Sequence, residues 1–334
     1  MSGSISYPGA AGRRKAFNPV VLRLIGRRIV ANLLLLLAVS LLVFLGTELL
    51  PGDVAQIVLG QGATPEAVAG LRAAMHLDQP AWIRYFIWLG GFVSGDFGHS
   101  LVNGDPVAAL IASRLPNSLL LAALTTMVSV PVALFLGITA AIWRGTLYDR
   151  IVNIVTVAAV SVPEFLIATL AVLVFAVRLH WLPALAYLGG ADSFTGLLRV
   201  FALPVITLSF AIVAQMARMT RVALVNTLES PYVEMAVLKG AGRVRIVLRH
   251  ALLNAIGPIA NAIALSLSFL LGGVIIVETV FDYPGLAKLM IDAVSTRDMP
   301  LVQACAMLFS AAYLVLVLLA DIASILSNPR LRFQ

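Results

Sequence analysis

Six long stretches of this chain carry very few charged side chains, and they restrict its fold more than any other feature. An α-helix rises about 1.5 Å per residue, so about 20 apolar residues cross a hydrocarbon layer of roughly 30 Å. Inside that layer only helices and closed barrels satisfy their backbone hydrogen bonds, and short alternating strands are absent here. We therefore predict an all-α, polytopic membrane helix bundle with six transmembrane helices, over residues 27–48, 117–141, 150–177, 203–225, 255–277 and 302–325.

Basic residues predict how the bundle lies in the membrane. With the N-terminus inside, sixteen of the 23 Lys and Arg residues fall in segments on the cytoplasmic side. Such an excess marks the inside of a membrane protein, so both termini are expected there. The net charge of +7 then follows from topology and from contact with membrane lipid, and we predict no nucleic-acid partner.

The predicted spans divide the chain into five parts. These are a cytoplasmic tail (1–26), the first span (27–48), an external helical segment (49–116), a transmembrane core with the other five spans (117–325) and a second cytoplasmic tail (326–334). In the external segment, Thr64 is placed to cap a short helix that begins at Pro65. The aromatic stretch "PAWIRYFIWLGGFV" predicts an interfacial helix, and a seventh span is the alternative.

The stretch "SPYVEMAVLKGAGRVRIVLRHALLN", residues 230–254, is polar and basic between two apolar runs. Ser230 and Pro231 are typical of a helix start, and Gly240 is typical of a left-handed stop. The apolar stripe that follows predicts a second, amphipathic helix along the inner membrane surface, with Arg243, Arg245 and Arg249 towards water. Such a helix pair is suited to docking into a soluble partner, whereas an ordinary basic loop would explain the charges alone.

One carboxylate lies within a predicted span. Glu164 follows Pro163 in "SVPEFLIA", near the middle of 150–177. A carboxylate at this depth is costly and normally faces a cavity or a partner, so Glu164 and Pro163 are candidates for a translocation path. The alternative is a structural pair with an arginine or a backbone group.

The sequence offers no constellation that predicts an enzyme. It contains no G-x-x-x-x-G-K-[ST] nucleotide loop, its four histidines are scattered, and Ser100 and Ser118 have no catalytic partners by spacing. The single cysteine, Cys305, lies in an apolar run and reads as a small core residue. We therefore predict no catalytic residues, no metal site and no cofactor bound by this chain.

"EMAVLKG", residues 234–240, resembles the E-A-A-x-x-x-G signature of permease subunits in binding-protein-dependent ABC importers. Glu234, Ala236 and Gly240 match it, and Met235 departs from the usual alanine. Further stretches resemble the B-type permease of the oligopeptide, dipeptide and nickel transport family, in family order. They are "LPGD" (50–53), "GLRAAMHLDQPAWIRY" (70–85), "GDFGHSL" (95–101), "RLPNSLLLA" (114–122), "LKGAGR" (238–243), "ETVFDYPGL" (278–286) and "NPRLR" (328–332). His76 departs from the family's usual glycine.

The resemblance implies a bacterial or archaeal protein of the cytoplasmic membrane that forms half of a translocation pathway. Its implied partners are a homologous C-type permease, two ATPase subunits that bind ATP and Mg, and an extracytoplasmic solute-binding protein. Residues 227–254 would form the coupling region, and the implied coupling residues are Glu234, Ala236, Lys239, Gly240 and Arg243. The expected substrates are di- or oligopeptides. The alternatives are nickel or another small solute in the same machinery, and, more remotely, a secondary transporter.

Overall fold

A computed structural model describes residues 19–49, 64–74, 78–187 and 193–327. Four predicted features lie wholly or partly outside the described residues: the N-terminal tail up to residue 18, "LPGD", His76, and the C-terminal tail with "NPRLR" from residue 328. Within the described part the structure is helical, and its only strand-like pairing is an isolated bridge between His99 and Pro106.

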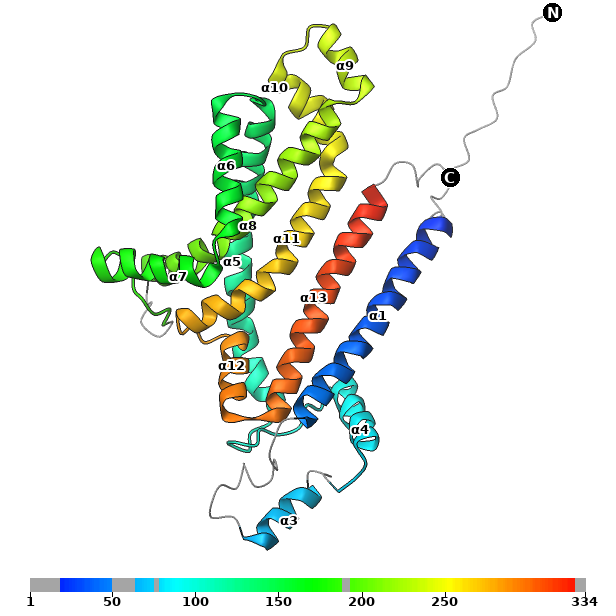
Figure 1. Cartoon of the computed structure of the whole chain (residues 1–334), viewed down its shortest axis with the longest axis vertical. Coiled ribbons are helices and arrows are strands. Elements are labelled where there is room, and N and C mark those ends of the chain that lie inside the picture. The colour runs from blue at the N-terminus through cyan, green and yellow to red at the C-terminus, as the bar shows by residue number, and fades with distance from the viewer. Residues whose placement is uncertain (1–18, 50–63, 75–77, 188–192, 328–334) are drawn as a thin grey trace, which may run out of the picture.

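The helices form a bundle with smaller helices at both ends (Figure 1). In chain order they are α1 (Pro19–Glu48), α3 (Pro65–Ala74), α4 (Ala81–Ser94), α5 (Val107–Ile142), α6 (Leu147–Ser161), α7 (Glu164–Ala171), the π-helical η1 (Val172–Arg178), α8 (Phe194–Leu228), α9 (Pro231–Leu238), α10 (Arg243–Arg245), the π-helical η3 (Ile246–Ala251), α11 (Leu252–Val280), α12 (Leu286–Thr296) and α13 (Met299–Ser327).

The described helices confirm a polytopic membrane bundle. Five of them are long and apolar enough to cross a membrane, and α6 with α7 makes a sixth if that bent pair counts as one span. In Figure 1 the start of α1, the end of α13 and the α9–α10 region lie at one end, whereas α3, α4 and α12 lie at the other. This arrangement agrees with an N-in, C-in topology in which the basic segment faces the cytoplasm.

The third predicted span, 150–177, is not one straight helix. α6 and the α7–η1 segment meet at an angle of 98°. Val162 is extended because the residue before a proline avoids helical geometry, and Pro163 is extended as well. The continuous apolar run did not predict this bend, because hydropathy depends on composition and not on the direction in which a helix runs.

Other helix bounds also differ from the prediction. α5 begins at Val107, inside the segment 49–116, and α8 begins at Phe194 rather than at 203. Ser193 caps α8 by accepting a hydrogen bond from the Gly196 amide. Both helices therefore extend beyond their apolar stretches, which marked only the membrane-spanning parts.

The second helix of the basic stretch was also placed wrongly. It does not lie separately along the membrane surface, because α10, η3 and α11 form one continuous helical run over Arg243–Val280. Val247 and Ala251 of the predicted stripe are buried, but Val244 and Leu248 are about half exposed. The basic residues therefore stand on the cytoplasmic extension of a spanning helix.

α5, α8 and α11 pack together around the main apolar core. α5 and α8 approach closely at Gly137 of α5, where an added Cβ would lie 2.7 Å from both the Ala217 carbonyl oxygen and Thr220 Cβ of α8. Small residues allow membrane helices to approach in this way. Ser129 Oγ donates to Ser209 Oγ across the same pair, at 2.9 Å.

α1 lies against α13 at the edge of the bundle. Near the cytoplasmic end, Arg28 pairs with Asp321 at 3.2 Å, and near the external end the Gln303 side-chain amide donates to Thr47 Oγ1 at 2.5 Å. The external helix α4 is attached through Tyr85, whose hydroxyl lies 2.8 Å from Ser40 Oγ. α1 thus connects the core to the external segment.

A buried carboxylate organises the external end. Glu278, at the end of α11, is fully buried and accepts hydrogen bonds from Ser118 Oγ (2.5 Å) and from the Ala287 (2.8 Å) and Lys288 (3.0 Å) amides. The amides belong to the first turn of α12, whose N-terminus favours negative charge. Gly285 is required here, because a Cβ at this position would overlap the carboxylate.

A second set of contacts strengthens this junction. The Tyr283 hydroxyl donates to the Asn117 carbonyl at 2.8 Å, and the Asn117 side-chain amide donates to the Pro284 carbonyl at 2.7 Å. Burial raises the pKa of the Tyr283 hydroxyl, so it stays protonated and able to donate at neutral pH. "RLPNSLLLA" and "ETVFDYPGL", far apart in sequence, are therefore in direct contact.

We expect Glu278→Gln to destabilise the folded chain by about 1.5–3 kcal/mol, the usual contribution of hydrogen bonds to a charged group. Glutamine keeps the size of the side chain but places an amide group where the α12 amides and Ser118 all donate. The measurement is the thermal unfolding midpoint of the purified chain in detergent. Glu66→Gln, on the exposed first turn of α3, is the control and should leave the midpoint unchanged.

Candidate coupling and translocation sites

The basic stretch folds into a short helix and a tight turn. α9 follows Ser230, which stands at the cap position without a side-chain capping bond, and Pro231 is its first residue. Gly240 has φ of +76°, the left-handed conformation expected for it, and its amide donates to the Val237 carbonyl at 2.8 Å. The chain then enters α10 after Gly242, which has an ordinary φ of −69°.

Val233 is the one buried side chain of α9, and most of the others are exposed. Val233 is fully buried, whereas Glu234, Lys239, Gly240 and Arg243 are exposed and Ala236 is half-buried. Apolar side chains share the exposed surface, namely Met235, Val237 and Leu238. An exposed surface that mixes apolar and charged groups is typical of a protein-docking site. The structure thus brings the five predicted coupling residues into one projecting knob, the α9 knob (residues 230–243).

A buried ion pair joins α6 to α8, the helix that leads into α9. Asp149 of α6 accepts two hydrogen bonds from Arg221 of α8, at 2.5 and 2.8 Å, and Asp149 Oδ2 also accepts from the Gly145 amide at 2.9 Å. The Asp149 and Arg221 side chains are only 5% and 17% exposed, so solvent screens the pair weakly. This bidentate pair fixes the α5–α6 connection to α8, the helix that leads into α9.

The same connection carries an exposed ion pair. Arg144 contacts Glu229 at 3.0 Å, and both side chains are about half exposed. Exposed pairs contribute little because water and salt screen them. Asp149–Arg221 is therefore the main polar link between the α5–α6 connection and α8.

Glu164 lies at the bend between α6 and α7. Its carboxylate packs against α11 at Gly273, where an added Cβ would lie 2.7 Å from Oε2, and Leu208 of α8 borders the same space. Glu164 is half-buried and Pro163 is exposed. Among the described residues none forms a hydrogen bond or an ion pair with this carboxylate, so the structure gives no support to the structural-pair alternative.

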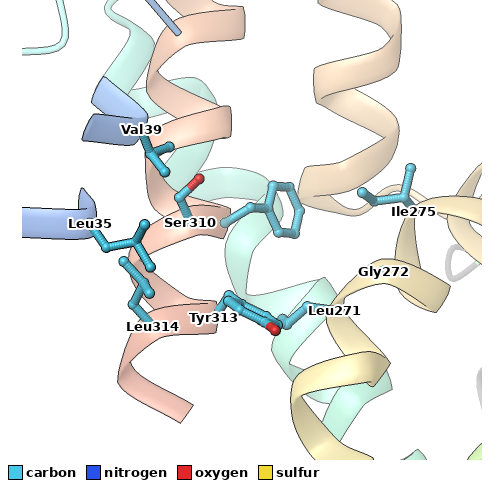
Figure 2. A pocket seen from close by; sticks show the side chains of 9 residues that line it. Leu35, Val39, Leu271, Gly272, Ile275, Ser310, Tyr313 and Leu314 are labelled. Carbon is cyan, nitrogen blue, oxygen red and sulfur yellow. The ribbon is translucent and has the colours of Figure 1, made fainter. Parts of the chain in front are cut away.

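A separate apolar cleft lies on another side of α11 (Figure 2). It has a volume of about 320 Å³ and is lined by side chains from α1, α11 and α13, namely Leu35, Val39, Leu271, Gly272, Ile275, Phe309, Ser310, Tyr313 and Leu314. The Ser310 hydroxyl already donates to the Ala306 carbonyl at 2.7 Å. The cleft therefore presents no charged group to a solute, unlike the bend at Glu164.

The described residues contain no group of three or more His, Cys, Asp or Glu side chains that could hold one metal ion. Cys305 is buried in the apolar cluster of α5, α12 and α13, in the small core position expected for it. Ser118 and Ser100 are also accounted for: their hydroxyls donate to Glu278 and Asp298, respectively. Each of these two hydrogen bonds joins segments that are distant in the sequence, so both serines have a structural role.

Sequence reasoning missed both polar junctions. Arg221 was counted only among the cytoplasmic basic residues, Glu278 appeared only within "ETVFDYPGL", and Asp149 was assigned no partner. The position of Glu278 just before "FDYPG" could have indicated its role, because this stretch ends a helix and allows the chain to fold back onto it. For Asp149 and Arg221, 72 residues apart, only the packing of α6 against α8 reveals the pair.

A polytopic bundle with a projecting helix between two spanning helices fits the class of membrane transport subunits. Residues 133–333 match the family "binding-protein-dependent transport system inner membrane component", and residues 21–122 match the N-terminal component of the same system. The chain belongs to this family. It is a multi-pass permease subunit of an ABC importer in the bacterial inner membrane, and subunits of this type are generally non-catalytic.

Curated relatives resemble this chain over nearly its whole length. The glutathione transport system permease protein GsiC of Escherichia coli strain K12 is 37% identical over 308 residues, which cover 92% of this chain and 98% of the relative. The proteins of the same name from Shigella dysenteriae and Salmonella choleraesuis give the same identity and coverage. The likeness therefore spans the external segment, the core and the α9 knob together.

We expect Asp149→Asn to destabilise the protein by about 3–5 kcal/mol, because it leaves the buried Arg221 guanidinium without its counter-charge. Glu229→Gln breaks the exposed pair and should cost at most about 1 kcal/mol. Thermal unfolding in detergent measures both variants. The double variant Asp149→Leu with Arg221→Met should recover much of the loss, since it removes both charges. Equal midpoints for Asp149→Asn and Glu229→Gln would contradict a dominant role for the buried pair.

Proposed function

We propose that this permease subunit imports di- or oligopeptides. The observation that carries the proposal is the 37% identity, over 92% of the chain, to permeases named for glutathione, which is itself a tripeptide. Nickel is the second candidate from the sequence, but the described residues offer no cluster of metal ligands in its favour. Membership of a binding-protein-dependent transport family disfavours a secondary transporter and supports an importer that works with ATPases.

We further propose that the α9 knob is the coupling element. Its exposed apolar and charged side chains would dock into a groove on an ATPase subunit, and Val233 would hold the helix to the bundle. The left-handed turn at Gly240 sets the direction of the chain between α9 and α10. Closure of the ATPases, which bind ATP and Mg, would then move the knob and switch the bundle between two packings.

The remaining partners belong to the same proposal. A homologous C-type permease would complete the pathway, and a solute-binding protein would deliver the peptide at the external end. The external helices α3 and α4 lie at that end, opposite the α9 knob (Figure 1). The binding protein and the ATPases would therefore contact opposite ends of this chain.

Affinity purification of the tagged chain from native membranes, in mild detergent, tests the proposed assembly. We expect a second homologous permease and ATPase subunits to copurify, as identified by mass spectrometry. Reconstituted with its binding protein, the complex should take up labelled peptides only when ATP is present. A chain that purifies alone and transports without ATPases would refute the assembly, and uptake of nickel but not of peptides would refute the substrate.

Gly240→Pro and Glu234→Arg test the coupling role. Proline fixes φ near about −65° and has no amide hydrogen, so it cannot form the turn seen at Gly240. Glu234→Arg reverses a charge on the exposed face of α9. We expect each variant to lower ATP-dependent peptide uptake roughly tenfold, equivalent to about 1.4 kcal/mol of lost docking energy, with normal membrane insertion.

Gly242→Ala is the matched glycine control. Its φ of −69° is open to any residue, and an added Cβ meets no atom within 4 Å. This variant should keep normal uptake and normal ATP consumption per peptide. Normal uptake by both Gly240→Pro and Glu234→Arg would refute the coupling role of the α9 knob.

A further inference from the structure

The bend between α6 and α7 places a carboxylate at membrane depth. α6 starts at the short cytoplasmic loop after α5, and its 15 residues cover about 22 Å. Glu164 follows immediately, at the point where α7 leaves the bundle sideways (Figure 1). A carboxylate that stands at this depth without a partner marks a functional site more often than a structural one.

The helix break adds a second electronegative feature to the same place. The Ala159 carbonyl accepts from the Val162 amide, but the carbonyls after it lose their helical donors, because Pro163 has no amide hydrogen and α7 turns away by 98°. The C-terminal end of a helix also carries a partial negative charge. Broken helices whose carbonyl ends lie beside a carboxylate are a recurring way of binding a cation inside a transporter.

The carboxylate is accessible and lies against the α11 backbone. Pro163 is exposed and Glu164 is half-buried, so the carboxylate is not enclosed in the core. On the α11 side, Gly273 leaves space for the carboxylate itself, since a Cβ there would lie 2.7 Å from Oε2. The carboxylate therefore rests on the α11 backbone with oxygen atoms free to accept hydrogen bonds.

We propose that Glu164 and the end of α6 at Val162 bind the protonated amino group of the peptide as it passes. The inference rests on the proposed peptide import and adds the chemical group that is recognised. An ammonium group has three donors, which one carboxylate and a few carbonyl oxygens satisfy. A divalent metal ion would require several converging ligands, and the described residues contain no such cluster.

Glu164→Gln is the first test, in the complete complex reconstituted into liposomes with its binding protein. Labelled glutathione and labelled dialanine are the probes. We expect transport at saturating binding protein to fall about tenfold, as for a lost hydrogen bond to a charged group. Asp321→Asn, which removes a carboxylate near the cytoplasmic end of α13, is the matched control and should transport at the wild-type rate.

Zero-length coupling is the second test and works on the wild-type complex. A hydrophobic carbodiimide activates buried carboxylates, and an adjacent amine then forms an amide bond. During turnover with dialanine, mass spectrometry should find a peptide adduct on Glu164. N-acetylated dialanine, which lacks the amine, and the Glu164→Gln complex should give none at this position.

The outcomes distinguish a failure of the proposed peptide import from a failure of the proposed amino-group site at Glu164. If the wild-type complex transports neither peptide, peptide import itself is refuted, and this inference with it. If wild-type transport is normal but Glu164→Gln transports equally well, or no adduct forms on Glu164, only the amino-group site is refuted. Should Glu164→Gln fail to assemble, Gly273→Ala, whose Cβ displaces the carboxylate, should lower transport instead. Unchanged transport by Gly273→Ala in that case would also refute the site.

Discussion

Burial away from water is costly for a charged group, so a buried carboxylate in this bundle needs hydrogen-bond donors within the protein. Three buried acidic side chains meet this requirement, and Asp298 does so by accepting from the Ser100 hydroxyl and the Leu101 amide. Glu278 accepts from Ser118 and from the first turn of α12, and Asp149 accepts from Arg221 and from the Gly145 amide. Glu164 does not, because no described residue forms a hydrogen bond or an ion pair with it. The same physical constraint thus separates structural carboxylates from one that is free to act on a ligand.

The satisfied groups join helices that are distant in sequence. Asp149–Arg221 fixes α6 to α8 at the cytoplasmic end, and the close contact at Gly137 fixes α5 to α8. Because α8 leads directly into α9, a force on the α9 knob acts on α5, α6 and α8 together. Packed interfaces of this kind shift between discrete arrangements rather than deform continuously. This is the property that an ATP-driven coupling element requires.

The sequence predicted those features of the structure that depend on local composition. The apolar stretches identify the spanning helices, and Gly240 identifies the left-handed turn after α9, because each follows from the residues present. The 98° bend at Pro163 and the pairing of Asp149 with Arg221 were not predicted. Both depend on the direction of one helix relative to another, which periodicity does not encode. The exposure of Glu164 was foreseen only as one of two alternatives, since burial depends on the same packing.

The position of the second helix of the basic stretch bears on the proposed transport mechanism. Because α10, η3 and α11 are continuous, the turn after α9 is joined by a single helical run to Gly273, the contact of Glu164, and to Glu278. From Arg243 to Gly273 this run covers about 45 Å at the rise of an α-helix. If the second helix lay separately on the membrane surface, the hinge between it and α11 would bend when the knob moved, and α11 would stay in place. Under the proposed coupling, the continuous run, which includes the π-helical η3 and Pro258, would instead carry that displacement towards the bend at Glu164.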